Sequence, residues 1–479
     1  MSAEKYEAVI GLEVHAQVLT KSKMFCSCAN AFGGEINSQI CPVCSGQPGA
    51  LPVINQAAIE LGVRAAIATH STIHAESVFA RKNYFYPDLP KGYQISQYEK
   101  PYCTQGKVEV VLNTGETKWI GLTRIHFEED AGKSIHATRG TRVDLNRAGV
   151  PLIEIVSEPD MRNSHEAGQY LRSLHSILRF GGICDGNLEE GSFRCDANVS
   201  VRLRGAPKFG TKVELKNINS FRYVEKAIDY EIARQIDCLE TGEKIHQETR
   251  GWNSAKGITE VMRAKEQAHD YRYFPEPDLP TLVIPDAWIE KIRSEMPEMP
   301  SAKRGRFKEQ YSLNEYDAGV LTASKELAEY YEAVVSGSGN AKAAANWVMN
   351  ELLGRLNAAG KEIDASPVSA PQLAQLIAQV EGGKISGKIA KTVFEEMFAT
   401  GRDPEAIIKE KGMVQISDPA ALEAAVRKVV AASPQQTADY KAGKVKLFAF
   451  FVGQVMKETK GQANPAMLND LVKKILDEG

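Results

Sequence analysis

The sequence of 479 residues lacks the features of a membrane-spanning, exported or uniformly basic protein. Its longest apolar stretch, residues 447–456, is about half of the roughly 20 residues that a membrane-spanning helix needs. The first residues contain neither the basic region of a signal peptide nor an Arg- and Ser-rich amphipathic helix, so we expect a cytoplasmic location. A net charge of −3 excludes a uniformly basic nucleic-acid binder. It is still compatible with a local basic patch, because salt confines the field of exposed charges to about 10 Å.

The sequence also lacks the motifs of common phosphate-handling and nucleophilic enzymes. Residues 131–134, Ala-Gly-Lys-Ser, resemble the end of a P-loop, but Phe127 stands where the first glycine is required and three acids precede the segment. Protein-kinase signatures and a Gly-x-Ser-x-Gly elbow are absent. If the chain handles a nucleotide, we therefore expect Mg²⁺ held by carboxylates on a sheet.

Cysteine is absent beyond residue 238, and four of the eight cysteines lie close together in the sequence. Cys26-x-Cys28 and Cys41-x-x-Cys44 form two close pairs. Two such pairs can surround one tetrahedral Zn²⁺ with four thiolates. The sequence therefore predicts a structural zinc site, and disulfides are the weaker alternative in a cytosolic chain.

Acids and a histidine recur on segments with the pattern of β-strands. Glu13 and His15 are two residues apart, so on a strand both point to the same face. Glu128 and Glu129 lie at the end of a second strand, and Glu154 is a lone carboxylate in an apolar one. A buried carboxylate is costly unless it is paired or binds a metal ion. If the strands are neighbours, these residues form a site for a hard divalent cation, and solvated strand edges are the alternative.

Two later strand-like segments extend this pattern. Arg194, Asp196 and Asn198 share one face of the first, and Glu214 and Lys216 share one face of the second. A sheet face with so many charged groups is typical of a ligand-binding floor. A plain solvated face is the alternative interpretation.

A chain of this length is expected to hold two or three domains. Residues 1 to about 290 are predicted to be α+β with a mixed or antiparallel sheet. Apolar alternation predicts strands at 107–112, 117–125, 143–146, 152–156, 194–203 and 211–215, and helices at 55–69, 165–180 and 219–240. Beyond a proline-marked linker at 296–300, helical periodicity covers 321–335, 341–359, 370–380, 385–399, 419–432 and 440–457, with breaks at 401–413 and 433–439.

Lysines gather near the end of this helical region. Residues 440–460 carry five lysines and one acid, a net charge of +4. A solvated helix face explains this most simply. A helical module that grips a nucleic-acid backbone without reading its bases is the alternative.

Long motifs along the whole chain resemble one enzyme family, the B subunits of bacterial tRNA-dependent amidotransferases (aspartyl/glutamyl-tRNA amidotransferases). The matching stretches are VIGLEVHAQVL at 9–19, RKNYFYPDLPKGYQISQY at 81–98, TRIHFEEDAGKS at 123–134, VDLNRAGVPLIEIVSEPD at 143–160, GSFRCDANVSVR at 191–202, ELKNINSF at 214–221 and DYRYFPEPDLP at 270–280. Motifs of this length are highly specific.

The resemblance implies a heterotrimer in which this chain works with the amidase (A) subunit, which releases ammonia from glutamine, and with the small C subunit. The B subunit is expected to use ATP and Mg²⁺ to phosphorylate the side-chain carboxylate of misacylated Glu-tRNA(Gln), Asp-tRNA(Asn) or both. Ammonia then displaces the phosphate and forms the amide. Such chemistry relies on positioning and on neutralised phosphoryl charge, which fits the carboxylate-rich strands.

The resemblance also implies roles for residues in the matching motifs. His15, Glu128 and Glu154 are implied to be Mg²⁺ ligands, with Glu13 beside them as a catalytic candidate. Lys82 resembles the functional lysine that steadies ATP phosphates or the acyl phosphate, and Glu129 is an acid near the phosphoryl group.

Asp196 and Glu214 are weaker candidates for cofactor binding, from strand geometry alone. Some family members lack the four thiols, so Cys26, Cys28, Cys41 and Cys44 are expected to be structural zinc ligands. The implied domains are a cradle with the kinase site and a zinc knuckle over 1–293, a helical domain over 294–405 and a YqeY-like, tRNA-binding tail over 406–479.

Two other functions are compatible with the same residues. One is a Mg²⁺-dependent nuclease or phosphohydrolase that acts on RNA. The other is a zinc-stapled tRNA-binding scaffold without chemistry of its own.

Overall fold

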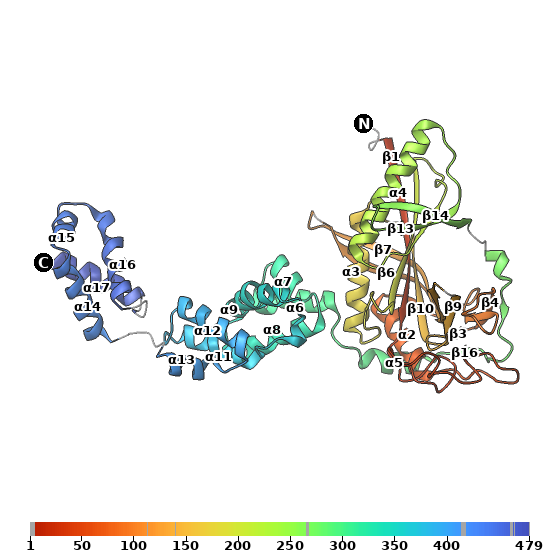
Figure 1. Cartoon of the computed structure of the whole chain (residues 1–479), viewed down its shortest axis with the longest axis horizontal. Helices are drawn as coiled ribbons and strands as arrows, with labels where there is room; N and C mark the ends of the chain where they lie inside the picture. The colour runs from red at the N-terminus through yellow and green to blue at the C-terminus, as the bar shows by residue number, and fades with distance from the viewer. Residues whose placement is uncertain are drawn as a thin grey trace. The chain divides into compact units, whose positions relative to one another are not determined.

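The computed structural model describes residues 5–112, 114–138, 140–264, 268–412, 418–459, 463 and 465–478. The chain divides into two compact units, Met1–Ala302 and Lys303–Gly479. The first is a mixed α/β unit built on a sheet, and the second is helical (Figure 1). This order confirms the predicted succession of an α+β region and a helical region.

A mostly antiparallel sheet forms the centre of the first unit. Its long central strand β1 (Tyr6–Gln17) lies between β10 (Pro151–Ser157) and β11 (Phe193–Leu203), and is antiparallel to both. Beyond β10 the sheet continues through β7 (Thr117–Glu129), β6 (Cys103–Val111) and β2 (Thr72–Ile73). Beyond β11 it continues through β12 (Val213–Lys216), β13 (Glu248–Asn253) and β14 (Ile258–Ala264). The parallel pairing of β12 with β13 makes the sheet mixed.

The two faces of this sheet differ in chemistry. On β1, Ile10, Leu12 and Val14 are buried in the main hydrophobic core, whereas Glu13 and His15 alternate with them and point to the opposite face. Helices α2 (Gln56–Ala68), α3 (Ser164–Phe180) and α4 (Phe221–Thr241) contribute to that core. In Figure 1, α3 and α4 lie along the strands. The helices therefore cover the apolar face and leave the charged face to other segments.

Short elements complete the first unit. Strand β4 (Ala80–Asn83) carries Lys82 and pairs with β5 (Tyr93–Ser96) and β15 (Phe274–Pro275). Two further small sheets pair β3 (Glu76–Ser77) with β16 (Leu282–Val283), and β8 (Lys133–Ala137) with β9 (Gly140–Asp144). Helix α5 (Asp286–Ser294) packs on α2.

The second unit consists of short helices. They are α6 (Pro300–Tyr311), which begins at the end of the first unit, α7 (Glu315–Leu321), α8 (Lys325–Ser338), α9 (Ala341–Asn346), a π-helix (Trp347–Leu352), α10 (Leu353–Ala358), α11 (Ala370–Glu381), α12 (Gly387–Thr400), α13 (Pro404–Lys411), α14 (Pro419–Ala432), α15 (Pro434–Lys441), α16 (Phe448–Glu458) and α17 (Pro465–Glu478). Helices α14, α16 and α17 share a hydrophobic core that includes Leu422, Phe451 and Val472. Among the described helices, none combines the length and apolar character that crossing a membrane requires.

Several predicted boundaries in the second unit were wrong. The segments 401–413 and 433–439 were predicted to be breaks, but α13 and α15 lie there, because Pro404 and Pro434 occupy first helical positions, where proline is favourable. The helix predicted at 440–457 is interrupted, because α15 ends before Gly443, which has φ +98°. The predicted helix 321–335 instead begins after Ser324, whose side chain caps α8.

In the first unit, the strand predicted at 143–146 ends at Asp144 as β9, and β13 and β14 were not predicted. Strand β13 has the sequence Glu-Thr-Arg-Gly-Trp-Asn. Because it contains a glycine and mostly polar residues, it lacks the alternation of apolar and polar residues that predicts a strand. The domain boundaries at 293/294 and 405/406 stay predictions. Lys460, the last lysine of the basic stretch, lies outside the described residues.

Candidate functional site

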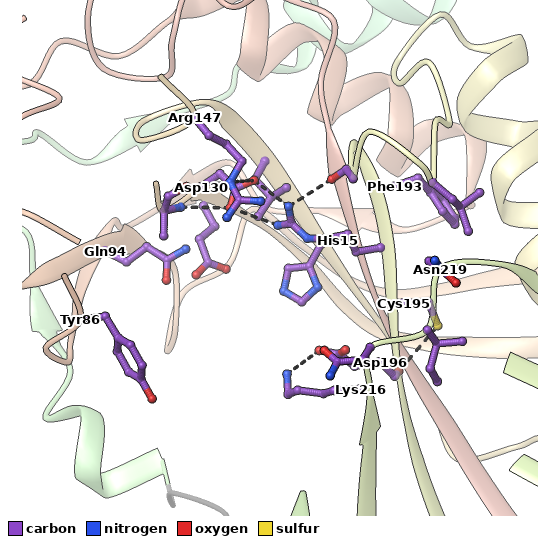
Figure 2. Close-up of a pocket in the computed structure, with 18 of the residues that line it drawn as sticks. His15, Tyr86, Gln94, Asp130, Arg147, Phe193, Cys195, Asp196, Lys216 and Asn219 are labelled. Atoms are coloured by element: carbon purple, nitrogen blue, oxygen red, sulfur yellow. Dashed lines mark hydrogen bonds and ion pairs between the residues drawn. The ribbon is translucent and has the colours of Figure 1, made fainter. Parts of the chain in front are cut away.

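The register of three neighbouring strands gathers several of the predicted side chains on the charged face. His15 of β1 is paired with Glu154 of β10, which in turn is paired with His126 of β7. His15 Nε2 lies 3.3 Å from Glu154 Oε2. One ligand atom from each of His15, Glu128 and Glu154 falls within 4.8 Å of the others. Figure 2 shows the His15 ring pointing into the cavity beside these strands.

Lys82 reaches this cluster from β4. Its Nζ lies 3.3 Å from Glu128 Oε1, whereas Glu128 Oε2 is buried without a hydrogen-bond partner. Burial raises the pKa of Glu128 to about 7, although Lys82 opposes that rise. Burial alone would lower the pKa of Lys82, but Glu128 raises it well above its ordinary value. Lys82 is therefore a half-buried cation next to an acid that has one oxygen without a hydrogen bond.

The other carboxylate of the cluster is held as an anion. Burial would raise the pKa of Glu154, but His126 and His15 outweigh it and the pKa lies well below the ordinary value. Burial likewise opposes protonation of His15, and its hydrogen bond with Glu154 raises the pKa of His15 above 6.5. By contrast, burial lowers the pKa of His126 to about 4. A neutral His126 whose Nε2 lies 3.5 Å from Glu154 Oε2 can donate a hydrogen bond to it.

This donor set fits a divalent cation. It offers two carboxylates and one imidazole on adjacent rigid strands. Without a ligand, the Oε2 atom of Glu128 would cost about 1–3 kcal/mol as a buried acceptor that lacks a hydrogen bond. The predicted ligand triad is thus assembled with room for an ion.

A cavity of about 670 Å³ opens beside the triad. Its lining includes His15, Lys82, Glu128 and Asp196. Asp196 is paired with Lys216 across the β11–β12 edge, with Oδ2 2.6 Å from Nζ (Figure 2). The cavity is polar enough and large enough for an anionic substrate group.

Two arginines line the same cavity, and both lie near one aspartate. Asp130 accepts two hydrogen bonds from the Arg194 guanidinium, at 2.8 and 3.1 Å, and Arg147 Nε lies 3.7 Å away (Figure 2). Gln17 donates a further bond at 2.8 Å. Burial works against ionisation, but Arg194 and Arg147 lower the pKa of Asp130 to about 2. Asp130 therefore fixes Arg194, whereas Arg147 is held at the same wall mainly by its hydrogen bonds to the Ala131 and Gly132 carbonyl oxygens, at 2.9 and 2.6 Å.

Three other predicted residues lie apart from this cavity. The Glu129 carboxylate pairs with Lys91 and accepts the Ile95 N–H at 2.9 Å. The Glu214 carboxylate is buried and accepts a bond from Thr249 Oγ1 at 2.7 Å. Glu13 accepts a bond from Asn198 Nδ2 at 2.9 Å and lines a different cavity. The structure therefore brings Lys82 and Asp196 to the triad, but not these three carboxylates.

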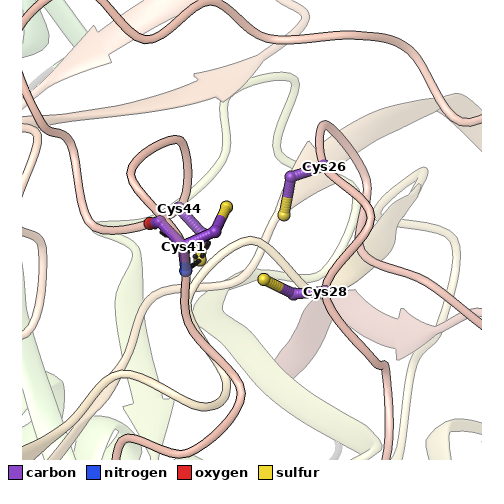
Figure 3. Close-up of side chains that lie close together, drawn as sticks. All are labelled: Cys26, Cys28, Cys41 and Cys44. Carbon is purple, nitrogen blue, oxygen red and sulfur yellow. Dashed lines mark hydrogen bonds between the residues drawn. The ribbon is translucent and has the colours of Figure 1, made fainter.

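The four predicted zinc ligands form a second cluster. Figure 3 shows the sulfurs of Cys26 and Cys28 directed toward the loop that carries Cys41 and Cys44. All four sulfurs lie within 4.8 Å of one another, and the Cys41 and Cys44 sulfurs are 3.9 Å apart. A tetrahedron with Zn–S bonds of about 2.3 Å has edges of about 3.8 Å. The spacing therefore fits one Zn²⁺.

The surroundings of Cys44 favour a thiolate. Cys26 donates to its sulfur, Lys23 Nζ lies 3.6 Å away, and together they lower the pKa of Cys44 to about 4 against the effect of burial. The Cys41 backbone N–H donates to the same sulfur at 3.2 Å. A metal-ligating cysteine must be deprotonated, so this environment suits ligation.

Comparison with known proteins matches both units of the chain. Residues 8–290 match the model of the GatB/GatE catalytic domain, and residues 329–476 match that of the GatB domain. The chain belongs to the amidotransferase B-subunit family.

Curated relatives of this B-subunit family cover the chain almost completely. A protein of Syntrophotalea carbinolica is 56% identical over 473 residues, which is 98% of this chain and 99% of that protein. One of Carboxydothermus hydrogenoformans is 55% identical over 474 residues, 98% of each chain. One of Bdellovibrio bacteriovorus is 56% identical over 479 residues, 100% of this chain and 99% of that protein. Each is named as the B subunit of an aspartyl/glutamyl-tRNA(Asn/Gln) amidotransferase.

For this member of the B-subunit family, sequence reasoning missed several residues around the site. His126 was missed, although it precedes Glu128 by two residues and so lies on the same strand face, as Glu13 and His15 do on theirs. Arg147 was missed because it lies in a turn rather than on a strand. Tyr84 and Tyr271 line the cavity from two distant segments, which no local pattern connects.

Proposed function

We propose that this chain is the B subunit of a tRNA-dependent amidotransferase, and that it phosphorylates the side-chain carboxylate of Glu-tRNA(Gln), Asp-tRNA(Asn) or both. The observation that carries the proposal is the His15–Glu128–Glu154 cluster with Lys82 at its edge, beside a cavity of about 670 Å³. Family membership supports it, because the relatives are named for the amidotransferase. The reaction would be a glutamine-dependent, ATP-driven ligation.

In the first step, a carboxylate oxygen of the aminoacyl group attacks the γ-phosphorus of ATP, and the bond to the bridging oxygen of ADP breaks. His15, Glu128 and Glu154 would hold Mg²⁺, which neutralises phosphoryl oxygens when bound. Lys82 supplies a fixed positive charge that faces the transferred group and cannot be lost at neutral pH, because its pKa is raised.

In the second step, ammonia attacks the acyl carbon, the bond to the phosphate oxygen breaks, and phosphate leaves as the amide forms. Ammonia would come from glutamine through the amidase (A) subunit, and the small C subunit would complete the heterotrimer. Arg194, fixed by Asp130, and Arg147, held by two backbone carbonyl oxygens, are suited to hold the anionic phosphate or the tRNA end.

The remaining predicted parts have supporting roles in this proposal. Zn²⁺ would be bound by Cys26, Cys28, Cys41 and Cys44. It would stabilise the loops that carry these residues and take no part in the chemistry. The lysines of residues 441–457 would bind the tRNA backbone in a YqeY-like tail, and the first unit would act as the cradle. Asp196, paired with Lys216 at the cavity, stays a candidate for cofactor binding.

The test is phosphate release from ATP by the reconstituted trimer, with and without misacylated tRNA, for the wild type and Glu154→Ala. We expect release that depends on Glu-tRNA(Gln) or Asp-tRNA(Asn) and is lost in the variant. Release that survives Glu154→Ala would place the phosphoryl site elsewhere.

Experiments on the same preparation distinguish the proposed function from two alternatives. Cleavage of the tRNA by the purified chain would favour a Mg²⁺-dependent nuclease. A scaffold without chemistry would bind tRNA equally well in the wild type and in Glu128→Ala, and would show no ATP-dependent amide formation with free ammonia in either.

A further inference from the structure

The tyrosine-rich segment around Tyr271 has no part in the chemistry proposed above. Tyr271 and Lys82 line the same cavity, although they lie far apart in the sequence. The centre of the Tyr271 ring lies 5.3 Å from the ammonium nitrogen of Lys82. A cation within about 6 Å of the face of an aromatic ring is attracted by the electrons of that ring. Tyr271 is therefore a neutral partner of Lys82, in addition to the acidic partner Glu128.

Lys82 needs a second partner because its ion pair with Glu128 is weak and shared. A lysine side chain has a flexible four-carbon stem, so one contact does not fix its ammonium group. Lys82 Nζ lies 3.3 Å from Glu128 Oε1, longer than the roughly 2.7–2.9 Å of a strong charge-assisted hydrogen bond. Glu128 is also one of the three groups arranged to hold a divalent cation. A carboxylate that shares its charge with such a cation attracts Lys82 less, whereas the attraction of the Tyr271 ring stays the same.

Two other tyrosines hold the Tyr271 ring in place. The centre of the ring lies 6.0 Å from that of Tyr84 and 6.1 Å from that of Tyr273, in edge-to-face geometry in both cases. Tyr84 is fixed by the hydrogen bond that its hydroxyl donates to Gln94 Oε1 at 2.8 Å. Tyr273 is fixed by stacking on Tyr98, with the ring centres 4.2 Å apart. Edge-to-face and stacked pairs are favourable arrangements of aromatic rings, so the Tyr271 ring belongs to a packed cluster.

The backbone that carries Tyr271 is held by Asn83, the last residue of β4. Strand β15 pairs with β4 through Phe274 and Pro275. Just before that pairing, Asn83 Nδ2 donates hydrogen bonds to the carbonyl oxygens of Arg272, at 2.9 Å, and Tyr271, at 3.2 Å. Arg272 has φ +46°, a conformation that a residue other than glycine keeps only where its surroundings hold it. The two hydrogen bonds therefore fix the position from which the Tyr271 side chain extends.

We propose that Tyr271 is a positioning residue for the phosphorylation step. Its ring holds the Lys82 ammonium group toward the transferred phosphoryl group, and Asn83 acts through Tyr271. The ring attracts the ammonium group without neutralising it, so Lys82 keeps its whole charge for the phosphoryl oxygens. Tyr271 itself forms no bond with a substrate. This inference rests on the proposed function, because it concerns the lysine that the phosphorylation step uses.

The experiment measures kcat and KM of the reconstituted trimer for phosphate release that misacylated tRNA stimulates. Tyr271→Leu removes the aromatic face and should lower kcat by about 5- to 30-fold, with KM for Mg-ATP and for aminoacyl-tRNA within about twofold of wild type. Tyr271→Phe keeps the ring and should leave kcat within about twofold. Tyr316→Leu, which removes a tyrosine ring 74% exposed in the helical unit, is the matched control and should change neither constant.

Two combinations of variants test the route through Lys82. Asn83→Ala removes both hydrogen bonds to the backbone at Tyr271 and should lower kcat in the same way, and it carries the test if Tyr271→Leu does not fold. Addition of Tyr271→Leu to Asn83→Ala should cost less than about twofold more, because both changes act on one ring. In a Lys82→Gln background, Tyr271→Leu should also cost less than about twofold more, since the ammonium group is gone. Losses that multiply in the Lys82→Gln background would overturn the positioning role.

The outcomes separate this inference from the proposed function. Wild type without tRNA-stimulated phosphate release overturns both. Active wild type with an unchanged kcat in Tyr271→Leu and in Asn83→Ala overturns the positioning role alone. A higher KM for aminoacyl-tRNA at an unchanged kcat, with weaker tRNA binding in fluorescence anisotropy, also overturns it, because the ring would then bind the RNA. An equal loss of kcat in Tyr271→Phe and Tyr271→Leu overturns it as well, since the hydroxyl group rather than the ring face would be responsible.

Discussion

His15 and Glu154 are cross-strand partners whose Nε2 and Oε2 atoms lie 3.3 Å apart. The same oxygen lies 3.5 Å from His126 Nε2, so one carboxylate oxygen is flanked by two imidazoles. The two rings keep Glu154 ionised in a buried position. The sheet thus presents an anion that is oriented before any ligand binds.

Glu154→Gln should reduce tRNA-stimulated phosphate release by about 100-fold or more, since a metal ion stabilises phosphoryl charge by several kcal/mol and each 1.4 kcal/mol is a factor of about ten. The variant keeps the shape of the side chain but removes the charge. Phosphate release at saturating Mg²⁺ measures the effect. Glu158→Gln, directly after the same strand, should leave the rate within about twofold. Equal rates for both variants would refute the ligand role of Glu154.

His126→Gln should weaken Mg²⁺ binding by about 10- to 100-fold, the usual cost of removing a group that orients a metal ligand. The imidazole is buried and its pKa is lowered to about 4, so it is neutral and can donate to Glu154 at working pH. Titration of phosphate release with Mg²⁺ should shift the midpoint and largely restore the rate at high Mg²⁺. His136→Gln, on β8, is the control. A lower rate at every Mg²⁺ concentration with an unchanged midpoint would argue against this role.

Elemental analysis should find about one zinc per chain and a loss of zinc in Cys44→Ser, because four ligands are needed to complete a tetrahedral site. Removal of zinc should lower the melting temperature of the first unit, since binding free energy is also folding free energy. Cys238→Ser should retain the metal, because this cysteine lies on α4, away from the cluster. Retention of zinc in Cys44→Ser would contradict the assignment.

The triple variant Lys441→Gln, Lys444→Gln and Lys446→Gln should weaken tRNA binding equally for all tRNA sequences. Each lost phosphate contact should also reduce the slope of log K against log salt by about 0.7–0.9. Fluorescence anisotropy over a range of salt concentrations measures both effects. Removal of three other lysines of the same unit, Lys342, Lys361 and Lys409, is the control for total charge. A slope that falls equally in both variants would mean that the tail makes no specific contact.

The sequence indicates which face of a strand a residue occupies, but it does not indicate the neighbouring strand. The spacing of Glu13 and His15 already places both on one face. That β10 and β11 flank β1 depends on pairings between residues about 140 and 190 positions apart, which alternation does not encode. The same limit explains Glu129. It follows Glu128 directly, so its side chain leaves the strand on the opposite side and meets Lys91.

Proline was the other source of error, because the same residue type ends one helix and begins the next. Pro404 and Pro434 lie in predicted breaks, yet both stand at first helical positions. By contrast, the zinc cluster could be predicted from the sequence. Its four ligands lie within one short segment, so local spacing was enough to predict their convergence.

Asp130→Asn should destabilise the protein by about 2.5 kcal/mol at pH 7, because the pKa of Asp130 is lowered from 3.8 to about 2 and each unit corresponds to about 1.4 kcal/mol. The folded state prefers the ionised carboxylate, since Arg194 and Arg147 pair with it. This stability is present above the unfolded pKa of about 4 and is lost as the pH falls toward 2.

The difference in free energy of unfolding between wild type and Asp130→Asn should therefore be constant from about pH 7 to 5 and shrink below about pH 4. Urea denaturation at each pH, followed by tryptophan fluorescence, measures it. Glu189→Gln, which neutralises a carboxylate outside this ion-pair cluster, should show little difference at any pH. A constant difference down to about pH 3 would mean that Asp130 stabilises the fold through hydrogen bonds, and that its charge contributes nothing.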